Sequence, residues 1–299
     1  MTIFHEGELL VQERAGVSEM AASVGQSIQP YLTPYIAKFL LNQQAVYVGT
    51  ADRQGHLWAS PLIGGPDFIQ ILNEQAVRLR ASAFPHDPLA DNLIFGENIG
   101  LLGIELETRR RVRLNGSIQN LMVDSIDIAT IEVYGNCPKY IQKRHPVPID
   151  EPLATTPVHR GERLTAAQQA WIGQADTFFI ASAHPGSGID MSHRGGQPGF
   201  VRVEGDTRLL WPDYAGNMMF NTLGNIAVNP QVGLLFLDFE RGSTLQLTGR
   251  AEIIWDETCV AQFTGAERVL AFDLEAAVEM EAILPWRWQL AEYSPFNPK

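Results

Sequence analysis

The 299-residue sequence has few cysteines and no long apolar run. Cys137 and Cys259 are its two cysteines, too few for a disulfide framework or a cysteine-based zinc site. No apolar run is long enough to span a membrane, and His5, Glu6 and Glu8 stand where a secretory signal would carry positive charge. We therefore expect a soluble, cytoplasmic protein without a membrane partner.

Positive charge is also scarce. Lys and Arg together number 22 against 34 for Asp and Glu, which gives a formal net charge of −12. Such a chain repels a polyanion overall, so no nucleic-acid partner is expected. The seven His residues show no paired spacing of the kind that binds metals, and neither a Gly-x-Ser-x-Gly nor a P-loop pattern occurs. No metal is expected, and a hydrolase or a nucleotide triphosphatase is disfavoured.

Hydrophobic periodicity divides the chain into two similar halves. Apolar residues at three- and four-residue steps predict helices within residues 13–41, one of them over 34–42, and strand patterns begin at Ala45. A proline-rich stretch interrupts the periodicity, and the same order then restarts with a short helix over 166–173 and a strand from Thr177. The predicted division is a first domain at 1–145, a linker at 146–160 and a second domain at 161–299.

The two halves align with each other over about seventy residues, a self-similarity that indicates duplication. Ser60 is placed on Ser192, an offset of 192 − 60 = 132. Further aligned pairs are Gly64 with Gly196, Pro66 with Pro198, Phe68 with Phe200 and, after one inserted residue, Asn92 with Asn225 and Gly100 with Gly233. We therefore expect a mainly β fold with flanking helices (α+β), made of two tandem Greek-key-like barrels that pair as a pseudo-dimer.

The two copies differ where ligand donors would lie. The second copy has Ser192-His193-Arg194 in a Gly-rich strand edge, where the first copy has Ser60-Pro61-Leu62. Pro and Leu side chains offer no donor to an anion, so the second copy is expected to keep the ligand site. The first copy is then a structural partner with a degenerate site. The arginines at 109, 110, 111 and 113 are interpreted as a solvated strand edge.

Several segments of the second copy occur in an order typical of one flavoprotein family. They are Asp190-Met191-Ser192-His193-Arg194, the stretch 216–230 that ends in Asn-Pro, the strand Val232-Gly233-Leu234-Leu235-Phe236, and Gly249-Arg250-Ala251-Glu252. In this order they resemble the pyridoxamine 5′-phosphate oxidase-like family, whose fold is the FMN-binding split β-barrel. The resemblance covers residues 166–254 well and 45–119 weakly. It implies two tandem FMN-binding split barrels in one chain.

The resemblance places FMN in a groove between the two barrels. The contacts carried over to this sequence are Met191, Ser192, His193, Arg194, Asn217, Asn221, Thr222 and Thr244, with Lys139 assisting at the phosphate. Arg194 and Asn221 would hold the phosphate, while Ser192 and Thr244 would orient the ring. The vitamin B6 oxidase has an Arg-Lys pair where this chain has Asn221 and Thr222, so that specific activity is not expected.

The function expected from this resemblance is that of an FMN-dependent oxidoreductase acting on a small molecule. The flavin ring itself carries hydride or electrons, so few catalytic side chains are needed and none can be named. A nicotinamide compound is a candidate electron donor, and a homodimer is compatible with such barrels. Two alternatives stay open. One is a non-catalytic module that binds heme, a deazaflavin or a protein partner on the same fold, and the other is a flavin reductase that feeds a partner enzyme.

Overall fold

The computed structural model describes residues 3–149 and 157–299, in which strands are the main secondary structure. The first half of the chain forms a seven-stranded antiparallel sheet with the order β2 (Leu57–Ile63), β1 (Ala45–Ala51), β5 (Asn98–Glu105), β6 (Arg110–Met122), β7 (Ser125–Gly135), β4 (Ala76–Leu79) and β3 (Ile69–Asn73). The second half has the order β11 (Gly188–Gly195), β10 (Thr177–His184), β14 (Gln231–Leu237), β15 (Thr244–Ile254), β16 (Arg268–Met280), β13 (Arg208–Asp213) and β12 (Arg202–Glu204).

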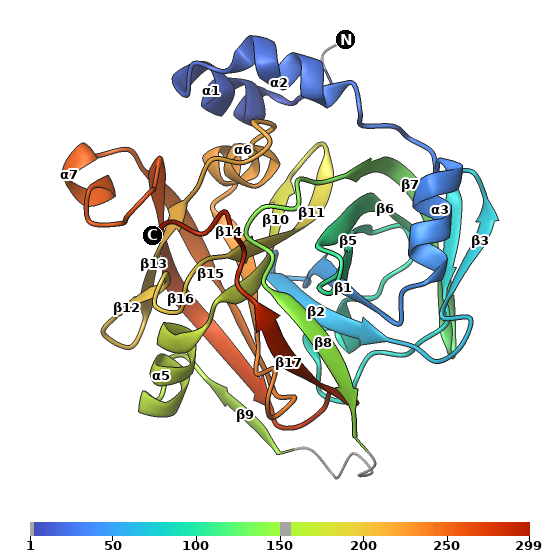
Figure 1. Cartoon of the computed structure of the whole chain (residues 1–299). Coiled ribbons are helices and arrows are strands. Elements are labelled where there is room, and N and C mark those ends of the chain that lie inside the picture. Colours follow the sequence, from blue (N-terminus) through green and yellow to red (C-terminus); the bar gives the residue numbers. More distant parts are fainter. Residues whose placement is uncertain (1–2, 150–156) are drawn as a thin grey trace.

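Both sheets have the same strand order when β1 is matched with β10 and each later strand with its counterpart (Figure 1). Side-chain contacts repeat as well. The Asn92 amide donates to the Thr50 hydroxyl across 3.2 Å, and its counterpart Asn225 donates to Ser182, the counterpart of Thr50, across 3.0 Å. The predicted fold of two tandem split barrels is therefore confirmed.

The two copies pack against each other through equivalent surfaces. The rings of Tyr47 and Phe179, counterparts at an offset of 179 − 47 = 132, stack with their centroids 3.7 Å apart. The Gly100 backbone lies against Ile189, and its counterpart Gly233 lies in the same way against the first copy. A residue that contacts its own counterpart lies on the two-fold axis of an isologous interface. The chain thus forms a pseudo-dimer by itself.

The helices lie at the edges of the barrels. They are α1 (Glu6–Arg14), α2 (Ser18–Gly25), α3 (Pro34–Leu41), α4 (Pro88–Asn92), α5 (Ala166–Gln174), α6 (Asn221–Val228) and α7 (Glu257–Val260). The predicted helices over 34–42 and 166–173 are confirmed by α3 and α5. Thr33 caps α3 ahead of a proline, and Thr165 caps α5 in a capping box. The helical pattern predicted for 13–41 misses the start of α1 at Glu6 and a non-helical stretch around Pro30.

A two-stranded ribbon of β8 (Lys143–Pro148) and β17 (Trp286–Glu292) crosses in front of both barrels (Figure 1). A further strand, β9 (Val158–Gly161), adds to the second sheet by pairing with β16. The predicted linker at 146–160 thus overlaps strands at both ends, and residues 150–156 lie outside the described residues. Within the described ranges, no helix is long and apolar enough to cross a membrane.

Candidate functional site

A cavity lies between the two copies, and both copies contribute to its wall. Strand β6 of the first copy supplies Arg111 and Arg113, while β11 of the second copy supplies Ser192-His193-Arg194. Most of the other lining residues come from 136–140 and 212–223. The space, its open mouth included, is about 890 Å³. The first copy is therefore part of this cavity as well as a structural partner of the second.

The structure brings seven of the nine predicted site residues to this cavity: Lys139, Ser192, His193, Arg194, Asn217, Asn221 and Thr222. Met191 and Thr244 do not line it. The Met191 side chain is fully buried in an apolar cluster with Tyr47 and Phe179. Thr244, on β15, is the counterpart of Arg111 at an offset of 244 − 111 = 133, so it occupies the pseudo-symmetric position away from the cavity.

The interpretation of the arginines within 109–113 as a solvated edge is wrong for Arg111 and Arg113. Both line the cavity, and Arg113 is only 5% exposed. Arg110, one position before Arg111, is exposed and forms an ion pair with Glu105 across 2.6 Å. Side chains alternate between the two faces of a strand, so Arg111 and Arg113, two positions apart, lie on one face of β6, and Arg110 does not share it. This spacing was a signal for two arginines that face the same site.

Arg111 is a cation that meets only neutral acceptors among the described residues. Its Nε donates to the carbonyl oxygen of Cys137 across 2.9 Å. Its Nη1 donates to Nδ1 of His193 across 3.1 Å and to the carbonyl oxygen of His193 across 3.2 Å. Burial lowers the pKa of Arg111 to about 10, with a further contribution from Arg113, so the guanidinium stays charged at neutral pH. Arg111 therefore brings to the cavity a positive charge that has no carboxylate partner among the described residues.

Arg113 links the cavity to the polar interior of both copies. Its Nη1 donates to the hydroxyl of Tyr134 across 2.6 Å and to Oδ1 of Asp190 across 2.9 Å. Its Nη2 donates to the hydroxyl of Ser192. Because Arg113 and Ser192 come from different copies, this contact fixes the two strand edges relative to each other at the cavity wall.

Arg194 has a carboxylate partner. Its Nη1 donates to Asp213 across 2.8 Å, and the other Asp213 oxygen lies 2.9 Å from Arg268. One carboxylate thus neutralises part of the charge of two guanidinium groups, that of the half-buried Arg194 and that of the buried Arg268. Burial lowers the pKa of Arg194, but the ion pair opposes this change. Arg194 therefore contributes less uncompensated charge to the cavity than Arg111 does.

Asn221 and Thr222 are also engaged by the protein. The Asn221 amide donates to Oε1 of Glu8 across 2.5 Å, and the Thr222 and Ser192 hydroxyls lie 3.0 Å apart. Sequence reasoning could not find the contact with Glu8, because the two residues are separated by 213 positions along the chain. The side chain of Asn221 is thus held in place rather than free to reorient.

His193 is neutral, and its tautomer is fixed by Arg111. A guanidinium can only donate, so Nδ1 of His193 accepts the hydrogen bond and Nε2 carries the proton. The pKa of His193 lies well below its usual range, because the ring is buried and because Arg111 and other arginines are near. The Nε2 proton has no acceptor among the described residues.

Unpaired donors are concentrated around this cavity. Four of its lining side chains have a buried N–H group without a partner among the described residues: Arg113 at Nε, Asn136 at Nδ2, His193 at Nε2 and Arg194 at Nε. A buried polar group without a partner is costly, and native structures contain few of them. The wall therefore suits an occupant that is rich in acceptors and carries negative charge.

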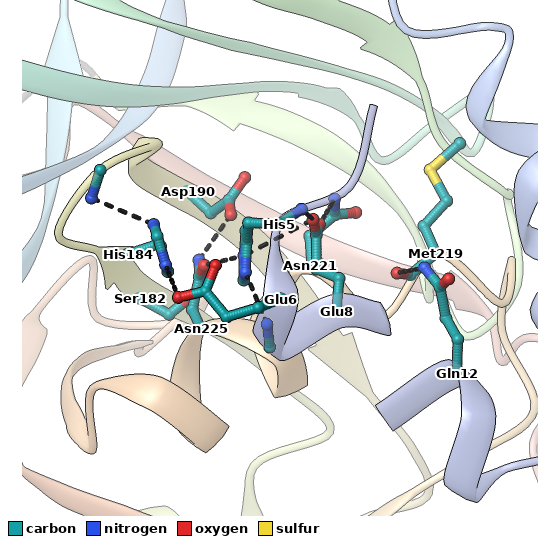
Figure 2. A network of polar contacts seen from close by, with 12 residues as sticks. His5, Glu6, Glu8, Gln12, Ser182, His184, Asp190, Met219, Asn221 and Asn225 are labelled. Atoms are coloured by element: carbon teal, nitrogen blue, oxygen red, sulfur yellow. Dashed lines mark hydrogen bonds and ion pairs between the residues drawn. The ribbon is translucent and has the colours of Figure 1, made fainter. Parts of the chain in front are cut away.

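The N-terminal helix α1 packs against α6 and the segment before it, which line the cavity. Figure 2 shows two of these contacts, Glu8 with Asn221 and Gln12 with Met219. Gly7 of α1 lies against the backbone of Gly224 in α6, with no room for a side chain between them. Gln12 donates to the carbonyl oxygen of Met219 across 2.9 Å, next to Met218 and Phe220, which line the cavity with positive φ angles of 66° and 61°. The contacts of α1 thus hold a strained segment of the wall in its conformation.

His5, Glu6 and His184 each place one possible metal ligand within 4.8 Å of the others (Figure 2). Nδ1 of each ring, however, accepts a hydrogen bond from a backbone amide two residues ahead. The proton then sits on Nε2, which faces Asn225 in His5 and Glu6 in His184. The rings are stacked, with centroids 4.1 Å apart, so their in-plane lone pairs do not converge. These contacts describe a hydrogen-bonded helix cap, and the expectation of no metal site stays a prediction.

Two sheets of identical strand order with a donor-rich cavity between them define a tandem split-barrel protein. Residues 164–281 match the family model described as pyridoxamine 5′-phosphate oxidase. The second copy of the barrel is therefore similar to the pyridoxamine 5′-phosphate oxidase family. No curated protein sequence matches the chain.

Solved structures with similar folds are distant in sequence. HupZ of Group A Streptococcus is 16% identical, with a TM-score of 0.33 over 39% of this chain and 98% of that one. A putative pyridoxamine 5′-phosphate oxidase from Lactobacillus delbrueckii is 15% identical, with a TM-score of 0.33 over 39% and 94%. A FAD-binding protein from Mesorhizobium loti is 14% identical, with a TM-score of 0.29 over 41% and 97%.

Proposed function

We propose that this protein is a flavoprotein that binds FMN in the cavity between its copies and passes electrons to or from a small molecule. The observation that carries the proposal is the uncompensated charge of Arg111 beside unpaired N–H donors. A phosphate supplies negative charge and several acceptor oxygens, and charge-assisted hydrogen bonds to Arg are among the strong ones. The resemblance of the second copy to FMN-binding split barrels supports a flavin as the group that carries this phosphate.

The residues around the cavity have distinct proposed roles. Arg111 and the Nε2 proton of His193 would bind the phosphate, and Arg194 would add a partly compensated charge. The hydroxyls of Ser192 and Thr222 would lie at the polar edge of the ring. The bound flavin would supply hydride or electron transfer, which no side chain can perform alone. The protein residues then bind and orient the flavin, and no catalytic side chain is assigned.

One flavin per chain is the proposed stoichiometry. The pseudo-symmetric counterparts of Arg111 and Arg113 are Thr244 and Gln246, at an offset of 133. At that second position Asp87, only 1% exposed, accepts hydrogen bonds from Ser60 across 2.6 Å and from Gln246 across 3.2 Å. A buried carboxyl group in place of arginines disfavours a second phosphate.

The mouth of the cavity is where a nicotinamide donor is proposed to approach. Lys139 lies there, and its ammonium contacts only the carbonyl oxygen of Ala215, across 3.4 Å, and the ring of Phe296 among the described residues. The Tyr140 and Tyr214 rings lie close by, with centroids 5.1 Å apart. A cation and aromatic rings at the entrance suit an anionic molecule with a flat ring.

The second candidate function is a binding module without turnover, for heme, a deazaflavin or a protein partner. The observation that favours it is the engagement of Asn221 by Glu8 and of Arg194 by Asp213. Both side chains would have to share their donors with a phosphate, which weakens the case for tight FMN binding at that wall.

The test is an absorbance spectrum of the purified protein, followed by mass identification of any released chromophore. We expect two flavin bands, release of FMN, and a ratio of one FMN per chain on titration. A colourless protein that FMN does not restore would exclude the proposal, and titration with heme and a deazaflavin would then examine the second candidate. Steady-state oxidation of a nicotinamide donor by the FMN-loaded protein would distinguish turnover from binding.

A further inference from the structure

Cys137 lies at the cavity in surroundings that favour negative charge. It is half-buried between β7 and β8 and lines the cavity. Its carbonyl oxygen accepts the hydrogen bond from Nε of Arg111, and Lys139 follows two residues later. Neither cation has a carboxylate partner among the described residues, whereas Asp213, the acid in the lining, is shared by Arg194 and Arg268. Cys137 therefore lines a recess beside two cations that have no carboxylate partner among the described residues.

Two buried side chains of the same cavity have unpartnered N–H groups. Arg113 and His193 are each 5% exposed and line the same cavity. Each has an N–H group without a partner among the described residues, Nε in Arg113 and Nε2 in His193. A small anion that entered the recess would meet donors around it and the thiol of Cys137 at its edge.

We propose that Cys137 is a modification site selective for small anionic electrophiles and small anionic disulfides, a proposal that rests on the anion-binding character of the cavity proposed above. A thiolate is the reactive form of cysteine, and neighbouring cations attract an anionic reagent toward it. The chemical class of co-reactant is a disulfide that carries carboxylates.

The modification is a thiol–disulfide exchange. The Cys137 thiol releases its proton to solvent, and the thiolate sulfur attacks one sulfur of the small disulfide. The S–S bond of the reagent breaks, a mixed disulfide forms at Cys137, and the other half leaves as a thiolate. Cys137 is oxidised and the leaving half is reduced, so no further oxidant is needed. The attached anionic group would then occupy the recess in place of a phosphate.

Cys259 provides a control within the same chain. It is also half-buried and free, but it follows Asp256 and Glu257 in α7, and its amide donates to Asp256 across 2.9 Å. Acidic neighbours repel an anionic reagent, whereas a neutral reagent of similar size responds mainly to steric access. At each cysteine, the ratio of the rate with an anionic reagent to the rate with a neutral reagent therefore separates the effect of charge from that of steric access.

The experiment measures second-order rates of alkylation by iodoacetate, which is anionic, and iodoacetamide, which is neutral. Peptide mass spectrometry resolves Cys137 from Cys259 in the full chain at low salt. We expect the iodoacetate to iodoacetamide ratio to be about tenfold or more higher at Cys137, because electrostatic attraction raises association rates by such factors. The difference should shrink as salt is added. Equal ratios at the two cysteines, or no reaction at Cys137, would overturn the proposal.

Variants of Arg111 test whether this residue causes the preference of Cys137 for the anionic reagent. Arg111→Gln should bring the ratio at Cys137 down toward that at Cys259, and Arg111→Lys should preserve it. If Arg111→Gln fails to fold, Arg111→Lys and the salt series on the unmodified chain still decide the outcome. A separate measurement compares the alkylation rate of Cys137 with and without FMN. A charge preference without FMN protection would retain the modification site and count against flavin in this cavity.

Discussion

Nη1 of Arg111 donates to Nδ1 of His193 across 3.1 Å, and the two residues come from different copies of the duplicated barrel. This hydrogen bond places the His193 proton on Nε2 and keeps the ring neutral beside a charged guanidinium. A single barrel would contain either Arg111 or His193, but not both. The cavity in its observed form therefore depends on the pairing of the two copies within one chain.

Removing the charge of Arg111 should weaken flavin binding. We expect Arg111→Gln to raise the Kd for FMN about tenfold or more, since hydrogen bonds to charged groups contribute ~1.5–3 kcal/mol. Quenching of FMN fluorescence on titration measures this affinity. Arg110→Gln is the matched control, because Arg110 is exposed and pairs with Glu105 outside the cavity. Equal affinities for both variants would remove Arg111 from the site.

Replacing Asp213 should lower the stability of the protein and raise its affinity for an anion. Asp213→Asn removes the carboxylate that the half-buried Arg194 and the buried Arg268 share, while Arg268 keeps its ion pair with Glu267. Breaking a fully buried ion pair costs about 3–5 kcal/mol, so we expect a loss of stability at or below the lower end of this range. The same change raises the positive potential of the cavity, so FMN affinity should rise. Urea unfolding and FMN titration of the variant measure the two effects. Lower affinity in a variant that remains folded would contradict this account of the charges.

The close contact of α1 with α6 predicts opposite effects of one substitution at two helical glycines. Gly7→Ala would place a methyl group into the backbone of Gly224 and should destabilise the protein by about 1–3 kcal/mol. Gly173→Ala in α5 has no atom within 4 Å of the new methyl group and should stabilise by about 0.5–1 kcal/mol. Thermal unfolding measures both. The same sign at both positions would argue against the observed packing of α1.

Glu8 should make stability fall as pH rises. Burial, with the nearby charges of Asp190 and Glu132, raises the pKa of Glu8 from 4.5 to about 8. In the folded chain Glu8 then keeps a proton that the unfolded chain has already released, so its contribution favours unfolding increasingly between about pH 4.5 and pH 8. Glu8→Gln should flatten this part of the profile of unfolding free energy against pH. An unchanged slope in the variant would assign the dependence to other groups.

The sequence predicted the fold because duplication leaves a local record. Strand periodicity and a constant offset, Ser60 on Ser192 and Asn92 on Asn225, are properties of residues close together in the chain. The structure repeats them as identical strand orders and equivalent hydrogen bonds. The donors of Ser192-His193-Arg194 could be read in the same way, because they occupy consecutive positions on one strand edge.

What only the tertiary structure decided is which side chains face one another. Arg111 and His193 are 82 positions apart, and Glu8 and Asn221 are 213 apart, so no local pattern relates them. The sequence by itself determined two barrels and one donor-rich edge. The packing of one barrel on the other brought Arg111 to that edge. Thr244, the counterpart of Arg111 in the second barrel, lies at the pseudo-symmetric position away from the cavity. A charge on one sheet becomes part of a site on the other sheet only when the packed surfaces enclose it and remove water from around it.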